Sequence, residues 1–260
     1  MCPHGASQTD EEFGRDHGLI HEVVVTGRKV GAGRDFWSKL AQDPALFERT
    51  VRFVSHGGLD RVEIELRARE IMGKNFFGIE EALDTFLFKL PARELAPLSE
   101  IPFSEEILLA CKDTHILVAV LPLSILQIRS QLNTKFFFSH DGAWYNNAGF
   151  AEERGQAGWH LISKLPVADS TAKTWYQQQP LLSACEMVPS ARIMVYSIIS
   201  HHAASGERLF PSVRVRCSTE DLPCGHVSVG RFNDNGLLIE YDLDSLSNNS
   251  LGLVTARQAA

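Results

Sequence analysis

The sequence lacks the export signal and the long apolar run that would take a chain across or into a membrane. Its first 17 residues, MCPHGASQTDEEFGRDH, hold no apolar run of the about 7 to 15 residues that an export signal needs. The longest apolar run, Ile116 to Ile125, is interrupted by Pro122 and Ser124 and is far shorter than the roughly 20 residues of a membrane span. We therefore expect a cytoplasmic protein with no membrane partner.

Paired cysteines and positive charge are also scarce. The five cysteines, an odd number, are scattered along the chain, which predicts no disulfide framework and fits a reducing compartment. The formal net charge of -7 disfavours broad binding to nucleic acid, which depends on a basic surface. Val25 to Lys74 alone carries a small basic surplus, ten Lys or Arg against seven Asp or Glu, and this keeps local nucleic-acid binding as a third hypothesis.

Intact catalytic motifs are absent as well. The sequence has no G-x-S-x-G elbow and no H-E-x-x-H pair. The candidates for proton transfer are Asp113 and His115, which come just before a predicted buried strand, and His140. Asp113 is equally typical of a turn cap and His115 of a hydrogen-bonded core histidine. Whether the protein is an enzyme, and with what cofactor, stays open.

One group of residues has the chemistry of zinc ligands. Cys217, Cys224 and His226 form the pattern C-x6-C-x-H, and sulfur and imidazole are the ligands that zinc prefers. The spacing does not match a zinc knuckle or ribbon. Cys217 also falls on the inward face of a predicted strand, where cysteine behaves as a small hydrophobe. We therefore favour no metal site at these residues.

The composition and the hydrophobic periodicity predict an α+β fold. A chain of 260 residues with 44% hydrophobic and 22% charged residues has room for one large domain or two small ones. We predict a disordered tail at 1–18, a small helix-rich region at 19–100 and an α+β domain at 101–260. In this interpretation the C-terminal part ends in an antiparallel sheet with helices packed on it.

The elements follow from apolar spacing and from capping residues. Helices are predicted to start near Phe36 and after Asp43, and to cover 79–88, 91–98, 103–111, 123–132, 148–154 and 189–204. Strands are predicted at 19–25, 114–121, 159–165, 212–217, 227–229 and 251–256, with a hairpin turn at 233–236. Residues 59–66 fit a strand or a helix.

The stretch VVVTGRKVGAGRDFW, residues 23–37, is typical of a strand, a basic glycine loop and a helix start. That order often holds a phosphate, because loop N–H groups and a helix N-terminus attract anions. Arg28, Lys29 and Arg34 are the candidate ligand-binding residues. The glycine spacing matches neither the phosphate-loop nor the dinucleotide motif, so a tight turn with solvated charges is the other interpretation.

An aromatic segment offers a second binding candidate. Three phenylalanines at 136–138, together with Trp144 and Tyr145, flank His140. Such a cluster stacks a planar ligand or forms a partner surface, and it is equally typical of core packing.

Five stretches that span nearly the whole chain after the tail resemble a group of uncharacterised proteins of environmental bacterial genomes. They are Thr26–Phe47, Ala68–Ala82, Ile101–Ala119, Trp144–Val167 and Ala191–Phe210. The resemblance implies a bacterial protein and brings no ligand or catalytic residue with it. Because intact catalytic motifs are absent and the aromatic segment is suited to a partner surface, our first hypothesis is a non-catalytic interaction or regulatory module that binds another protein. The alternative is an anion- or nucleotide-binding enzyme that uses the Gly27 to Arg34 loop.

Overall fold

The structure of the protein is a computed structural model that describes residues 10–55, 61–132, 134–138, 143–221 and 223–258. The chain divides into two compact units, Met1–Asp60 and Arg61–Ala260. The helix-rich region predicted for 19–100 is therefore shared between them. Helices and two mixed sheets occur together, which confirms the α+β class. None of the described helices is long and apolar enough to cross a membrane.

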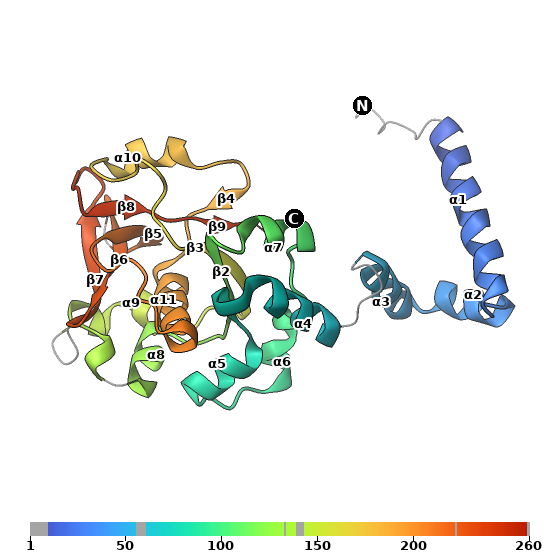
Figure 1. The fold of residues 1–260 in the computed structure, drawn as a ribbon, viewed down its shortest axis with the longest axis horizontal. Coiled ribbons are helices and arrows are strands. Elements are labelled where there is room, and N and C mark those ends of the chain that lie inside the picture. The colour runs from blue at the N-terminus through green and yellow to red at the C-terminus, as the bar shows by residue number, and fades with distance from the viewer. Residues whose placement is uncertain (1–9, 56–60, 133, 139–142, 222, 259–260) are drawn as a thin grey trace, which may run out of the picture. The chain divides into compact units, whose positions relative to one another are not determined.

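The N-terminal unit consists of three helices, α1 (Asp10–Lys29), α2 (Arg34–Gln42) and α3 (Pro44–Ser55) (Figure 1). The strand predicted at 19–25 is wrong, because α1 runs through it. Leu19, Ile20, Val23 and Val24 recur at the spacing of one helix face, which the run of three valines hides. α1 begins inside the predicted tail at 1–18, and residues 1–9 lie outside the described part.

The start of α3 follows the sequence prediction. Asp43 accepts the backbone N–H of Leu46 through its side chain at 3.0 Å, and Pro44 takes the first helical position. The Asp43 side chain satisfies a backbone N–H group that the helix start leaves without a partner. Pro44 has no backbone N–H group, so it leaves none unsatisfied. α2 and α3 are thereby separated by Asp43 alone.

The C-terminal unit begins with α4 (Arg61–Met72), so the ambiguous segment 59–66 is helical where it is described. The other helices are α5 (Ile79–Phe86), α6 (Ala92–Leu95), α7 (Glu105–Cys111), α8 (Ile125–Gln131), α9 (Gly149–Glu152), α10 (Trp175–Gln178) and α11 (Ala191–Ser205). Ser104 caps α7 by accepting the N–H of Ile107, as the sequence predicts.

Within the described residues of this unit, nine strands form two sheets. They are β1 (Phe76–Phe77), β2 (His115–Val120), β3 (Gly158–Ser163), β4 (Glu186–Met187), β5 (Arg214–Glu220), β6 (Gly225–Asn233), β7 (Gly236–Leu243), β8 (Leu251–Leu253) and β9 (Ala256–Arg257). The first sheet has the order β1-β2-β3-β9-β4 and the second β7-β6-β5-β8. The pairs β1–β2 and β5–β8 are parallel, and the other pairs are antiparallel.

Helix α11 lies between the sheets and organises the core (Figure 1). It contacts β1 and β2 of the first sheet and β5 and β6 of the second. Its residues from Met194 to His201 are all buried, as expected of a helix covered on every side. Tyr196 donates its hydroxyl to the carbonyl of Ala119 at 3.0 Å, which ties the helix to β2.

The second sheet has one apolar and one polar face. Val215, Cys217, Val227 and Val229 alternate along β5 and β6 and belong to the core. The residues between them form a polar face together with β7, and six of these are at least nine-tenths buried. They are Arg214, Arg216, His226, Ser228, Asp242 and Asp244.

Candidate functional site

The glycine loop after α1 is a helix end and not an anion loop. Gly31 has φ +99° and its N–H bonds the carbonyl of Arg28, while the N–H of Ala32 bonds the carbonyl of Gly27. This pair of bonds is the Schellman motif, in which a glycine in the left-handed conformation closes a helix. The N–H groups of Val30 and Gly33 also bond backbone carbonyls. All four loop amides are occupied, so none of them is available to a phosphate.

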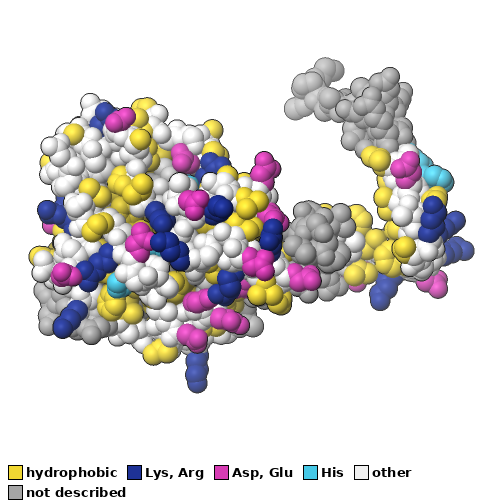
Figure 2. All heavy atoms as spheres, viewed as in Figure 1, with side chains coloured by type: hydrophobic (Ala, Val, Ile, Leu, Met, Phe, Trp, Pro, Cys, Tyr) yellow, Lys and Arg dark blue, Asp and Glu magenta, His cyan; other side chains and the backbone are white. Residues whose placement is uncertain are grey.

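The three basic candidates stand at this corner. Arg28 and Lys29 are in the last turn of α1, where positive charge suits the helix dipole, and Arg34 begins α2. All three side chains are exposed, and within the described residues no hydrogen bond or ion pair is recorded for them. Figure 2 shows Lys and Arg side chains gathered beside hydrophobic ones where α1 meets α2.

What the three helices do build is an apolar groove of about 790 Å³. Its lining comes from one face of each helix: Leu19, Ile20, Val23, Val24, Phe36, Trp37, Leu40, Ala41, Phe47, Thr50 and Val51. Leu19 is 62% exposed and Phe47 53%, and α2 has no buried residue at all. Contiguous exposed apolar surface of this kind marks interaction sites in soluble proteins.

Trp37 connects α2 to α1 at the base of the groove. Its ring packs edge-on against Phe36 with the centroids 4.9 Å apart. A Cβ atom placed on Gly27 would lie 2.5 Å from Cζ2 of Trp37, so the absence of a side chain there admits the indole. Gly27 therefore acts as a packing residue of α1, and the loop turns at Gly31.

The aromatic candidates divide between surface and core. Tyr145 is 3% exposed, and burial raises the pKa of its hydroxyl. Trp144 is 44% exposed and donates its indole N–H to the carbonyl of Ile239 at 2.9 Å, which fixes it to β7. The two residues thus form no shared flat surface for a ligand.

The proton-transfer candidates are not brought together either. Asp113 is exposed and follows α7 in a turn, while His115 begins β2. The Nδ1 atom of His115 lies 2.8 Å from the hydroxyl of Thr114, and burial, followed by the charge of Arg257, lowers the pKa of its ring. His140 lies outside the described residues.

The three candidate metal ligands are separated by the strand geometry. Cys217 is fully buried, and burial raises the pKa of its thiol, so the thiolate that zinc requires is disfavoured. Cys224 is exposed with φ +63°. His226 faces the polar side of the sheet, opposite to Cys217. Within the described residues no group of three or more His, Cys, Asp or Glu is placed to hold a metal ion.

His226 instead belongs to a buried polar network that spacing alone did not reveal. Its Nδ1 atom lies 2.6 Å from Oδ1 of Asp244, and its ring stacks on Trp175 with the centroids 3.8 Å apart. Arg214 pairs with Asp242 at 2.9 Å and also with Glu240. The network therefore binds β5, β6 and β7 together with charges of opposite sign.

Arg216 lies on the same polar face of the sheet and is fully buried. It donates to the carbonyls of Lys173, Leu243 and Leu246 and, at 2.9 Å, to Oε1 of Gln178. A buried guanidinium with four acceptors holds the segments that cover the sheet. The His226 side chain is only 5% exposed, and its Nε2 atom is 3.6 Å from the exposed Glu220. Because these buried groups are closed to a substrate, the network fits a structural role.

A second histidine cluster also lacks catalytic geometry. Ser205 and Glu207 both approach the same Nε2 atom of His201, each at 3.3 Å. In a catalytic triad the nucleophile and the carboxylate contact different ring nitrogens. Ser205 also donates to the carbonyl of His201 at 2.7 Å, so the cluster completes the end of α11.

Comparison of the chain with protein-family models, with curated proteins and with solved structures gives no match in any of the three. The resemblance to environmental bacterial proteins therefore stays a prediction. The functional argument rests on the geometry of the chain itself.

Proposed function

We propose that the protein is a non-catalytic interaction module, and that the groove of α1, α2 and α3 binds an amphipathic helix of a partner protein. The observation that supports this is the row of half-exposed apolar side chains that the three helices converge on. Complete burial of one such side chain contributes about 1.5–3 kcal/mol. Helices as short as α2 and α3 are marginal without packing, so a bound partner also stabilises the unit.

The charges beside the groove specify the partner further. Basic residues stand at the junction of α1 and α2 and along α2, namely Arg28, Lys29, Arg34 and Lys39. The acidic residue in the first turn of α2 is Asp35. Charge complementarity favours a helix whose apolar face is flanked by Glu or Asp. Partner helices that lie in grooves present apolar anchors at positions i, i+3, i+4 and i+7. The occupant we propose is such an acidic amphipathic helix.

Two synthetic peptides test this with the full-length chain. Both carry leucines at i, i+3, i+4 and i+7, one with Glu on the flanks and one with Lys at the same positions. We expect the Glu peptide to bind at least about tenfold more tightly in low salt, and this ratio to fall as salt screens the flanking charges. Calorimetry gives the affinities, and the indole N–H resonance of Trp37 reports the place of binding.

Matched variants locate the interaction. Phe47→Asp places a charge in the groove and should abolish binding of the Glu peptide, whereas Leu165→Asp changes a 70% exposed leucine of the C-terminal unit and should leave binding unchanged. Equal affinity for both peptides, or binding that survives Phe47→Asp, would contradict the proposal. A homodimer in light scattering that dissociates with Phe47→Asp would show that a second copy of the chain occupies the groove.

A further inference from the structure

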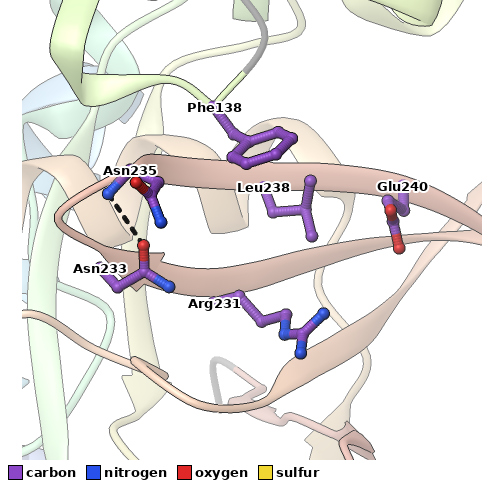
Figure 3. A pocket seen from close by; sticks show the side chains of 6 residues that line it. All are labelled: Phe138, Arg231, Asn233, Asn235, Leu238 and Glu240. Atoms are coloured by element: carbon purple, nitrogen blue, oxygen red, sulfur yellow. Dashed lines mark hydrogen bonds between the residues drawn. The ribbon is translucent and has the colours of Figure 1, made fainter.

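A small pocket opens where the β6–β7 hairpin meets Phe138. It has a volume of about 310 Å³, at the small end of ligand pockets. Among the described residues, six line it: Phe138, Arg231, Asn233, Asn235, Leu238 and Glu240 (Figure 3). The two asparagines stand at the turn of the hairpin, with Phe138 above Leu238 (Figure 3). The pocket is independent of the groove in the N-terminal unit and concerns a different ligand.

The backbone is bent to put Arg231 at this place. The register of β6 against β7 shifts between Gly230 and Asn233, as in a β-bulge. Arg231 has φ +47°, a conformation that side-chain-bearing residues adopt at a cost of about 1–3 kcal/mol. Its N–H bonds the carbonyl of Val213 at 2.8 Å, which holds the bulge. Strain of this kind gathers at ligand sites, because a bulge re-aims a side chain.

The guanidinium of Arg231 is the basic group of the pocket, and Glu240 is its acidic group. Glu240, the acidic residue of the lining, already pairs with Arg214, and Arg214 also pairs with Asp242. Within the described part of the chain no acceptor is recorded for the Arg231 guanidinium, whereas the backbone N–H of Arg231 bonds Val213. Burial lowers the pKa of Arg214, the charge of Asp242 raises it, and the charge of Arg231 lowers it. A bound anion would accept hydrogen bonds from the Arg231 guanidinium.

The rest of the lining suits a ligand with a flat apolar body. Phe138 is 57% exposed and forms an apolar wall with Leu238. The wall is held in place because Phe138 donates its N–H to the carbonyl of Leu237, and a side chain on Gly236 would collide with that segment. Asn233 accepts the backbone N–H of Asn235 at 2.9 Å and keeps its own amide N–H groups for a ligand.

From this geometry we infer that the pocket binds a small planar carboxylate, with its two oxygens on the Arg231 guanidinium and its ring or flat body against Phe138 and Leu238. A guanidinium matches a carboxylate with two parallel hydrogen bonds, which an ammonium or an amide cannot reproduce. The volume limits the ligand to a single ring or a body of similar size.

Benzoate is the probe, and neutral benzamide of the same shape is its control. Titrations of the ¹⁵N-labelled full chain are expected to shift the amide resonances of Arg231, Asn233 and Phe138 with benzoate at millimolar concentration and not with benzamide. Arg231→Gln should weaken benzoate at least tenfold. Arg231→Gly should also weaken benzoate binding at least tenfold. Because glycine adopts positive φ without strain, this variant removes the guanidinium and keeps the backbone conformation.

Arg208→Gln is the matched control variant. Arg208 is another arginine beside the hairpin, but it pairs with Asp234 and does not line the pocket. We expect it to change the benzoate affinity less than twofold. Equal shifts with benzamide, undisturbed binding to both Arg231 variants, or no shift with benzoate up to about 20 mM would each overturn the inference. An equal loss of benzoate affinity in Arg208→Gln would overturn the inferred site and indicate a general attraction of anions to the hairpin.

Discussion

At the scale of single residues, His160 links stability to pH. It lies in β3 opposite Val118, and burial, together with the charge of Arg192, lowers its pKa from 6.5 to about 4. Between these two values the unfolded chain binds a proton that the folded chain does not, so the free energy of unfolding falls as the pH drops from about 6.5 to 4. The complete shift corresponds to about 3 kcal/mol. Above pH 6.5 this effect on stability is absent.

Replacement of His160 isolates this contribution. His160→Gln removes the titrating group, so the loss of stability between pH 7 and pH 4.5 should be about 2 kcal/mol smaller in the variant than in the natural chain. Urea unfolding at the two pH values measures the difference. His21→Gln, on an exposed face of α1, should behave as the natural chain does. A pH dependence that His160→Gln leaves unaltered would contradict the assignment.

The residues that sequence inspection missed have a common property. Asp242, Asp244 and Arg216 carry no motif, and their partners lie on other elements: Arg214 on β5, His226 on β6 and Gln178 on α10. The available signal was alternation: β5 begins Arg-Val-Arg, and the end of β7 with the residue after it reads Asp-Leu-Asp, so that opposite charges recur at the same period of two. Motif reasoning selected His226 for its distance from two cysteines along the chain. In the structure the partner of His226 is the carboxylate of Asp244, which is 18 residues away in the chain.

At the scale of elements, the sequence predicts regular structure where apolar spacing and caps agree. α11, the buried β2 and the hairpin between β6 and β7 are confirmed for this reason. The error at 19–25 arose because three valines outweighed the helical spacing of their neighbours. Residues 59–66 stayed ambiguous because their apolar positions fit both periods. Short strands such as β1 and β9 are defined by partners distant in the chain and leave no local pattern.

Two glycines of α1 give opposite predictions. A Cβ on Gly27 would collide with Trp37, whereas a Cβ on Gly18 meets nothing within 4 Å. Gly27→Ala should therefore displace the Trp37 indole and change its N–H resonance, with the signals of Trp159 and Trp175 unchanged. Gly18→Ala should keep all tryptophan signals and raise helix stability by about 1 kcal/mol, because alanine loses less backbone entropy. Identical spectra for both variants would contradict the packing of Trp37 on α1.

At the scale of the whole molecule, the two units differ in how completely they bury their apolar residues. Every buried hydrophobic residue of the described chain lies between Ala68 and Ala256. The groove residues of the N-terminal unit are at best partly covered. The C-terminal unit therefore contains its own core, while the N-terminal unit depends on contacts that its three helices do not provide to one another.

This difference predicts separate unfolding of the two units. Residues 61–260, produced alone, should fold and unfold in one cooperative transition, with a free energy of unfolding within about 1 kcal/mol of the main transition of the full chain.

In the full chain, the Trp37 indole signal should be lost at lower urea concentration than the signals of Trp159 and Trp175. Addition of the Glu-flanked peptide should move the Trp37 transition alone to higher urea, because a ligand stabilises only the unit that it binds. A single coincident transition for all tryptophans would contradict this independence.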